Sequence, residues 1–224
     1  MLEPLLPMLL KKTIVLASES PRRVEILKKV GLKFKAVPSK FEENLDKAAF
    51  KHPYEYAKAT AKGKALDVFK SYSENTENCD EIPDVIIAAD TVVTLDDTIY
   101  GKPEDDKDAF EMLTRFSGRT QTVYTGVCII YNQADNCSTD NKGADQINTF
   151  HDATDVTFST MTSDVIQGYI DTGEPMGKAG GYGIQGIGGS LVESIHGDYY
   201  NVMGFPLNHF CRHLQEYLQN QTIA

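Results

Sequence analysis

Residues 13–27 read TIVLASESPRRVEIL, and this stretch decides the fold. Its apolar beginning, Thr13–Ala17, predicts a short buried β-strand. Ser20 then stands where a helix N-cap is expected, and Pro21 suits the first helical position, so a helix is predicted to end near Gly31. A strand that passes through a tight turn into a helix is typical of an α/β fold.

The rest of the chain continues this mixture of strands and helices. Val85–Ala89 is a continuous apolar run, which predicts a central strand. Residues 71–82 and 132–150 are polar, so a loop is expected in the first segment and a mobile insertion in the second. The remaining predicted elements are strands at Lys33–Val37, Gln121–Tyr131, Val156–Thr160 and Leu191–Ile195, a hairpin over Val92–Tyr100 that turns at Asp96-Asp97, and helices at Pro53–Lys70, Asp106–Phe116, Ser163–Thr172 and Pro206–Gln219.

The charge is acidic overall but unevenly divided along the chain. The 224 residues carry 22 Lys and Arg against 32 Asp and Glu, a net charge of −10, which argues against a general nucleic-acid binder. Residues 1–70 hold 15 Lys and Arg and 8 Asp and Glu, whereas residues 71–224 hold 7 and 24. This asymmetry indicates that the basic part has a separate role.

The cysteines and the apolar segments indicate the compartment. The four cysteines form no CxxC pair, which excludes a zinc ribbon and a thioredoxin-type motif and suggests buried thiols in a reducing cytosol. The apolar start of the chain precedes its basic pair, the wrong order for a signal peptide. No apolar run approaches the roughly 18 residues of a membrane span. A cytoplasmic protein without a membrane partner is therefore expected.

The turn after the first strand has the residues of an anion site. Arg22 and Arg23 occupy the first turn of the predicted helix, where the helix dipole favours acidic residues. An anion at this helix N-terminus would make both arginines favourable, and the Ser18 hydroxyl and free backbone N–H groups suit a polyphosphate. The alternative is that both arginines point to solvent or pair with neighbouring glutamates.

Acidic residues follow two of the predicted strands. Asp90 comes directly after Val85–Ala89, at the carboxyl end of the predicted sheet, where α/β proteins place their sites. Such a carboxylate holds Mg²⁺ or acts as a general base, and Glu43 would complete a Mg²⁺ site if it lay nearby. Lys64 and Lys102 are candidate phosphate ligands. The alternatives are a turn cap for Asp90 and solvated surface charges for the other three residues.

A glycine-rich stretch, GKAGGYGIQGIGG, covers residues 177–189. Its GxGxxG match has no strand before it and a predicted strand after it, so a dinucleotide site is excluded, and a Walker A loop fails on residue identity. A loop whose backbone closely approaches a ligand is predicted instead, with Lys178, Tyr182 and Gln185 as candidate contacts. A Gln amide offers a donor and an acceptor, which suits the imide edge of uracil or thymine.

Together these segments resemble the Maf (septum-formation) family of nucleoside triphosphate pyrophosphatases, and animal members most of all. The resemblance runs in family order across nearly the whole chain. The matching segments are LASESPRR (16–23), FEENL (41–45), AKGKA (61–65), AADT (88–91), GKP (101–103), LTRFSGRTQTVYTGV (113–127), GEPMGKAGGYGIQG (173–186) and GDYYNVMGFPL (197–207).

The resemblance implies an enzyme that hydrolyses a nucleoside triphosphate to the monophosphate and pyrophosphate with a divalent metal. Mg²⁺ is the expected ion, with Mn²⁺ or Co²⁺ as alternatives. The implied structure is one Maf-like domain over residues 1–224, with a two-lobed α/β fold like that of inosine triphosphatases, an elongated mixed sheet and a central cleft. The implied partners are a small-molecule nucleotide and a second copy of the chain.

The family motifs also imply residue roles. Asp90 matches the general base and, with Glu43, the metal ligands. Arg22, Thr91 and Gln185 match the triad that marks the dTTP/UTP-preferring subfamily. The other matches are Ser18 and Arg23 in the phosphate-binding loop and Lys64 and Lys102 among the charged site residues.

Two other functions stay open at this point. A nucleotide-binding module that does not hydrolyse its ligand is favoured only by Gly177, which stands where the family commonly has Asp. A purine-directed pyrophosphatase of the inosine-triphosphate type is the second alternative, against which Gln185 predicts a preference for UTP and dTTP.

Overall fold

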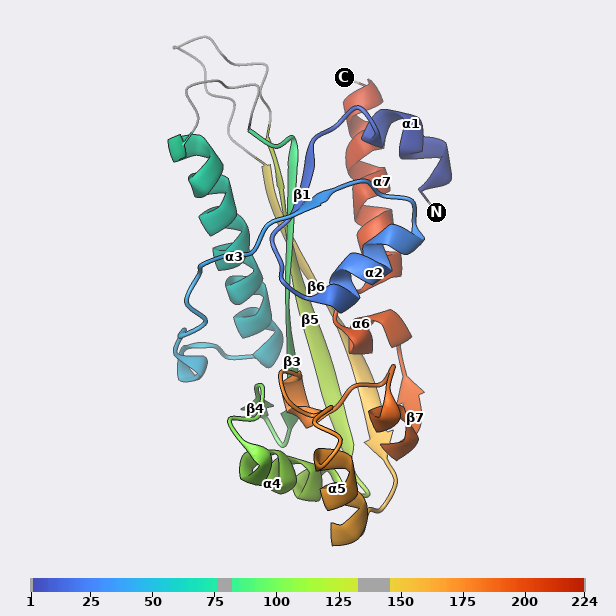
Figure 1. Cartoon of the computed structure of the whole chain (residues 1–224). Coiled ribbons are helices and arrows are strands. Elements are labelled where there is room, and N and C mark those ends of the chain that lie inside the picture. Colours follow the sequence, from blue (N-terminus) through green and yellow to red (C-terminus); the bar gives the residue numbers. More distant parts are fainter. Residues whose placement is uncertain (1, 76–81, 133–145, 224) are drawn as a thin grey trace.

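The computed structural model describes residues 2–75, 82–132 and 146–223 (Figure 1). Its centre is a seven-stranded sheet with the strand order β2-β1-β3-β5-β6-β7, and β4 pairs with β3 outside this path. The β2–β1 and β1–β3 pairs are parallel and the others are antiparallel. The predicted α/β fold with a mixed sheet is therefore confirmed.

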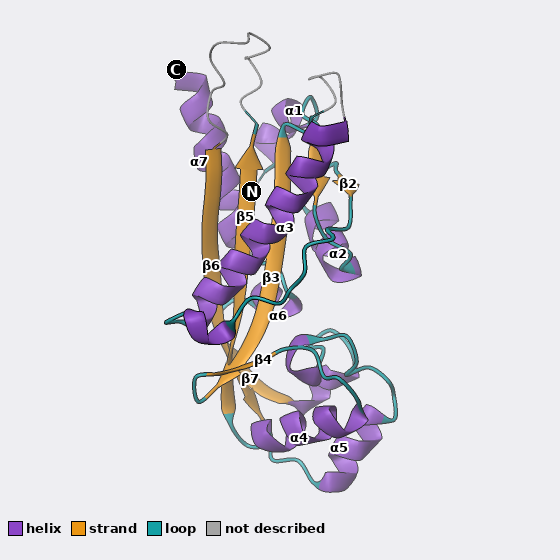
Figure 2. Cartoon of the chain, turned by 90° about the vertical axis from the view of Figure 1, so that its left-hand side faces the viewer, coloured by secondary structure: helices purple, strands orange, loops and turns teal. Residues whose placement is uncertain are grey.

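The strands differ greatly in length. β3, β5 and β6 are long and run from the upper part of the molecule down to the lower part, toward α4 and α5 (Figure 2), whereas β1, β2, β4 and β7 are short. The bounds are β1 (Ile14–Leu16), β2 (Lys35–Ala36), β3 (Val85–Leu95), β4 (Thr98–Tyr100), β5 (Thr120–Tyr131), β6 (Gln146–Phe158) and β7 (Val192–His196).

Helices cover both faces of the upper part of the sheet, as oriented in Figure 1. The long α3 packs on one face, and α1, α2 and α7 pack on the other. A lower lobe, made of β4, α4, α5 and the segment 171–191, surrounds the other end of the long strands. The bounds are α1 (Leu6–Leu9), α2 (Pro21–Lys29), α3 (Pro53–Asn75), α4 (Asp106–Phe116), α5 (Ser163–Ile170), α6 (Tyr199–Met203) and α7 (Leu207–Ile223).

Alternation along β3 divides the core of the upper part in two. Ile86 and Ala88 pack against Ala61 and Ala65 of α3, while Ile87 and Ala89 belong to the cluster on the α7 side. Because side chains alternate along a strand, the next two residues, Asp90 and Thr91, also point to opposite faces of the sheet. A separate cluster fills the lower lobe, with Phe116, Phe158 and Tyr182 among its members.

The end of β3 is the main difference from the sequence prediction. The strand does not end at Ala89 but continues through Asp90 to Leu95. The predicted hairpin with β4 is confirmed, and its turn has φ of 51° at Asp96 and 60° at Asp97. Positive φ at both turn residues matches the twist of the flanking strands.

A gap in the sheet lies beside the middle of β3. On one edge, β5 pairs with β3 along nearly its whole length. On the other edge, β1 pairs with Val85–Ile87 and β4 with Val93–Leu95. Within the described residues no strand pairs with Ala88–Val92 on that edge. Asp90 therefore lies beside an interruption of the sheet and not after the end of a strand.

Other bounds also differ from the predictions. α3 continues to Asn75, so the predicted loop begins later than residue 71, and β2 is shorter than predicted. β6 begins at Gln146, so residues 146–150 of the predicted insertion are a strand paired with β5. The rest of that insertion, residues 133–145, and residues 76–81 lie outside the described residues. Cys128 and Cys211 are free and buried, as expected for thiols in the core.

One glycine allows α3 to lie unusually close to the sheet. A Cβ atom on Gly126 of β5 would lie 2.5 Å from the carbonyl carbon of Ala57 and 2.7 Å from its oxygen. These are backbone atoms of α3, and unlike a side chain they cannot change rotamer to make room. The absence of a side chain at residue 126 therefore sets the spacing between α3 and β5.

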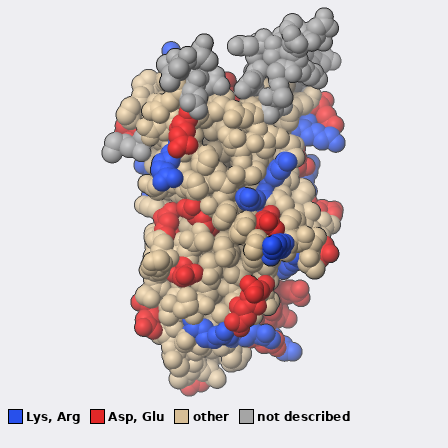
Figure 3. All heavy atoms as spheres, turned by 180° about the vertical axis from the view of Figure 1, so that it is seen from behind, with Lys and Arg blue, Asp and Glu red and all other residues tan. Residues whose placement is uncertain are grey.

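Charges of both signs are spread over the surface seen in Figure 3. On the face shown in Figure 3, Lys and Arg side chains are interspersed with Asp and Glu, and they form no extended basic area among the residues drawn in colour. In the described ranges, no helix combines the length and the apolar character that a membrane crossing requires.

Candidate active site

A cleft of about 500 Å³ opens at the gap in the sheet and reaches into the lower lobe. It brings together segments that lie far apart in the sequence: the turn before α2, the loop after β2, the middle of β3, the turn after β4 and the glycine-rich segment. The predicted site residues that line it are Ser18, Arg22, Arg23, Glu43, Lys64, Asp90, Thr91, Lys102 and Lys178.

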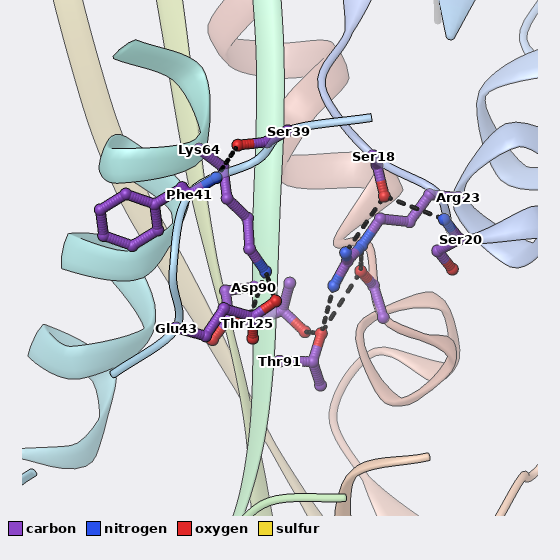
Figure 4. A network of polar contacts seen from close by, with 11 residues as sticks. Ser18, Ser20, Arg23, Ser39, Phe41, Glu43, Lys64, Asp90, Thr91 and Thr125 are labelled. Carbon is purple, nitrogen blue, oxygen red and sulfur yellow. Dashed lines mark hydrogen bonds and ion pairs between the residues drawn. The ribbon is translucent and has the colours of Figure 1, made fainter. Parts of the chain in front are cut away.

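Two carboxylates meet one lysine on the α3 side of the cleft (Figure 4). The Lys64 Nζ lies 2.8 Å from Asp90 Oδ1 and 2.9 Å from Glu43 Oε1. The Asp90 side chain is only 9% exposed, whereas that of Glu43 is 43% exposed. Burial acts to raise the pKa of Glu43, but Lys64, helped by Lys102, brings that pKa below its ordinary value. Glu43 is therefore ionised at neutral pH.

Arg23 forms the opposite side of the cleft, across β3 from Lys64 (Figure 4). Its guanidinium donates to the Gly204 carbonyl at 2.9 Å, to Thr91 Oγ1 at 3.1 Å and to Ser18 Oγ at 3.3 Å. In the described part of the chain no carboxylate lies within ion-pair distance of it. Burial lowers the pKa of Arg23, as expected for a cation paired with neutral oxygens only. Such a cation favours an incoming anion.

The start of α2 places both predicted arginines, Arg22 and Arg23, in the wall of the cleft. No acidic residue occupies its first turn, and the Ser20 side chain makes no capping bond, although Ser20 is at the N-cap position. The Ser20 N–H instead donates to Ser18 Oγ at 3.2 Å. Burial also lowers the pKa of Arg22, which lines the cleft beside Arg23. The turn thus presents two guanidinium groups without an acidic residue in the same helical turn.

The glycine-rich segment is organised by an acidic residue that the sequence analysis did not single out. The Glu174 carboxylate accepts the N–H groups of Ile187 at 2.8 Å and Gly188 at 3.0 Å, and the Tyr169 hydroxyl at 3.0 Å. Burial acts to raise the pKa of Glu174, but these bonds outweigh it and lower that pKa. The Glu174 carbonyl also accepts from Lys178 Nζ, which fixes this lysine in the cleft wall.

Glu174→Ala is expected to lower the free energy of unfolding by about 2 kcal/mol, because it leaves two backbone N–H groups and one hydroxyl without their charged acceptor. The midpoint of urea unfolding measures this change. Glu111→Ala is the matched control, since Glu111 makes only a 3.9 Å ion pair with Lys107 on the surface of α4. Equal midpoints for the two variants would contradict the role assigned to Glu174.

Gln185 is the one predicted site residue that does not line the cleft. Its side-chain amide donates to Glu25 Oε2 on α2 at 3.4 Å, at the protein surface. Other residues also line the cleft, and Lys47 and Tyr56 are among them. Lys47 Nζ donates to the Ile99 carbonyl at 3.4 Å. No motif marks either residue, because Lys47 stands in a stretch with many charges and Tyr56 belongs to the apolar pattern of α3.

Comparison with known proteins shows the family of the chain. The model of the family described as Maf-like protein matches residues 13–217. A human protein named "Probable bifunctional dTTP/UTP pyrophosphatase/methyltransferase protein" is 50% identical over 212 residues, which cover 94% of this chain and 33% of that protein. The chain thus spans about a third of the length of this human relative.

Two bacterial relatives match over most of their length. Both are named "dTTP/UTP pyrophosphatase". The one from Clostridium perfringens (strain 13 / Type A) is 44% identical over 205 residues, which cover 91% of this chain and 96% of the relative. The one from Thermosipho africanus is 43% identical over 195 residues, covering 87% and 88%. With its family model matched over most of the sequence, the chain belongs to the Maf family.

Proposed function

We propose that this chain hydrolyses dTTP and UTP to the monophosphate and pyrophosphate. The observation that carries the proposal is the cleft itself. Asp90 and Glu43 meet at Lys64 on one side of β3, and two arginines present guanidinium groups on the other side. The names of the relatives at 43–50% identity supply the class of substrate.

The cationic residues would bind the triphosphate. The turn from Ser18 to Arg23 offers backbone N–H groups, a hydroxyl and two guanidinium groups, a combination that binds phosphate oxygens. Lys102 and Lys178 lie elsewhere in the cleft wall, where each would add a charge toward the polyphosphate. Reaction at a phosphate depends mainly on positioning and on stabilising developing negative charge, and this set of cations supplies both.

The two carboxylates fit a divalent cation, because each has an oxygen within 3 Å of the same ammonium group. Among the described residues, no group of three His, Cys, Asp or Glu side chains forms a metal site on its own. Mg²⁺ commonly takes one or two carboxylates and completes its ligands with substrate phosphates, so it is the ion we propose, with Mn²⁺ or Co²⁺ as alternatives. When bound, the ion would neutralise phosphate charge.

Asp90 would act as the general base. Its carboxylate is nearly buried and is oriented by Lys64, so it is held in place to accept a proton from the water that attacks the α-phosphorus. The bond from the α-phosphorus to the bridging oxygen then breaks, and pyrophosphate leaves. Lys64 stays beside both carboxylates and limits the repulsion between Asp90 and Glu43.

Thr91 and Gln185 would recognise the pyrimidine ring of the nucleotide at the edge of the cleft. Thr91 lines the cleft and already accepts from Arg23, so its hydroxyl is fixed. Gln185 has a long surface bond to Glu25, so reading a pyrimidine requires its side chain to exchange this partner for the nucleotide. The imide edge of uracil or thymine has the donor and acceptor that complement an amide.

A panel of nucleoside triphosphates with Mg²⁺ tests the proposal. We expect UTP and dTTP to give the highest kcat/KM, with one pyrophosphate per monophosphate, and ITP, ATP and GTP to react more slowly. Pyrophosphate is measured directly, and the identity of the monophosphate is checked by chromatography. Binding without any pyrophosphate release would support a non-hydrolysing module, and preference for ITP would support a purine-directed enzyme.

The homodimer and the cytoplasmic location are part of the same proposal. Light scattering on the eluting peak of a size-exclusion column separates a monomer of 24.8 kDa from a dimer. Fractionation of cells that express the full-length protein tests the location.

A further inference from the structure

Glu43 lies in a segment that regular secondary structure does not hold. Between β2 and the short 3-10 helix Lys47–Ala49, residues 37–46 form neither helix nor strand. The Glu43 side chain is also 43% exposed. Even so, its carboxylate meets Lys64 at 2.9 Å, so some other contact must fix the segment 38–43.

The first such contact is a carboxylate on α3. Asp67 Oδ2 accepts the Ser39 hydroxyl at 2.8 Å and the Lys40 N–H at 2.7 Å. Ser39 Oγ in turn accepts the Phe41 N–H at 3.0 Å (Figure 4). Three successive residues of the segment are thus tied, directly or through one hydroxyl, to a single side chain.

The second contact is the packing of the Phe41 ring against Gly63 of α3. The Phe41 ring covers Gly63 of α3 so closely that a Cβ atom there would lie 2.5 Å from Cε2 and 2.7 Å from Cε1. Gly63 is next to Lys64, and Asp67 is one helical turn farther along. Residues three or four apart share a helix face, so the two anchors flank the lysine that Glu43 contacts.

We propose that Asp67 and Gly63 are positioning residues, which hold Glu43 beside Lys64 and Asp90 by anchoring the segment 38–43. Neither residue lines the cleft, so neither touches the nucleotide. Their effect passes through the peptide backbone of two residues to Glu43. The proposal rests on the hydrolytic function proposed above, and it adds residues outside the cleft to the catalytic arrangement.

Asp67→Ala tests the first anchor. We expect kcat with UTP to fall about tenfold or more, since a displacement of about 1 Å in a catalytic group is enough for such losses. KM should change less, because the arginine turn is untouched. Asp67→Asn keeps an oxygen acceptor and should recover most of the activity. Glu74→Ala removes an exposed carboxylate from the same helix and is the control, with turnover expected to be unchanged.

Gly63→Ala tests the second anchor. Alanine favours a helix more than glycine does, so the substitution in itself suits α3. The added Cβ would displace the Phe41 ring, and we expect the same loss of kcat as in Asp67→Ala. In the Glu43→Gln background, both substitutions should change kcat by less than twofold, because the group that they position has already been removed.

Hydrogen exchange in the protein without nucleotide gives a readout besides activity. In Asp67→Ala, the amides of Lys40 and Phe41 should exchange at least tenfold faster, while the amides of β3 stay as protected as in the wild type. Unchanged exchange at these two amides, or faster exchange with unchanged kcat, would overturn the proposal. If the wild type itself hydrolyses no nucleotide, the proposed function fails, and the exchange result still decides whether Asp67 orders the segment.

Discussion

Asp90→Asn is expected to lower the turnover of UTP and dTTP by roughly 10²–10⁴-fold, the range that general-base catalysis supplies. The amide has nearly the shape of the carboxylate but takes up no proton from water. The substitution also removes one of the two negative charges that contact Lys64. The rate of pyrophosphate release at saturating substrate measures the effect.

The fold should survive this substitution. Lys64 keeps its contact with Glu43 at 2.9 Å, so no cation is left without a partner, and an Asn oxygen still accepts from the ammonium. Urea unfolding and circular dichroism check this. Asp155→Asn is the matched control, because Asp155 also lies within a long strand, accepts from Thr122 and stands outside the cleft. Turnover near that of the wild type in Asp90→Asn would remove Asp90 from the mechanism.

Gly126→Ala is expected to lower the free energy of unfolding by about 3 kcal/mol, at the upper end of what overpacking costs. The new methyl group would meet backbone atoms of Lys58 and Ala57, so no side chain can rotate away to make room. Either α3 moves off the sheet or β5 distorts. Calorimetry or urea unfolding measures the loss, and kcat should fall as well because Lys64 is on the displaced helix.

Gly168→Ala is the control for this prediction. Gly168 lies in α5, and nothing stands within 4 Å of the position that its Cβ would take. The Gly168→Ala substitution should stabilise the protein by roughly 0.5–1 kcal/mol, because alanine has the higher helix propensity. If Gly126→Ala proved as harmless as Gly168→Ala, the close packing of α3 on β5 would not be a determinant of stability.

The elements with strong local signals were predictable from the sequence. α4 begins and ends where its pattern predicts, since Asp105 caps it and Phe116 closes its apolar face. The hairpin turn at Asp96 and Asp97 was also predictable, because few residue pairs adopt positive φ in succession. Both features depend on residues that are close together in the chain.

Features that depend on pairing between distant segments were not predictable in the same way. The apolar run Val85–Ala89 predicts a strand that ends before Asp90, because a charge inside a buried strand is costly unless it is paired. The partner that allows it, Lys64, comes from a helix 26 residues earlier. The role of Glu174 has no sequence signal either, because two of its three donors are backbone N–H groups.

The passage of β3, β5 and β6 through both lobes has a consequence for motion. Enzymes that close by a hinge bend at a few loop or element-terminal residues. Here the lobes share ladders of strand pairing that run without a break past the cleft, so a rigid-body hinge would have to bend three paired strands at once. The sheet then fixes the width of the cleft, and we expect the proposed nucleotide to bind without a change in that width. Binding would then order side chains and surface loops only, and the entropic cost of association would be low.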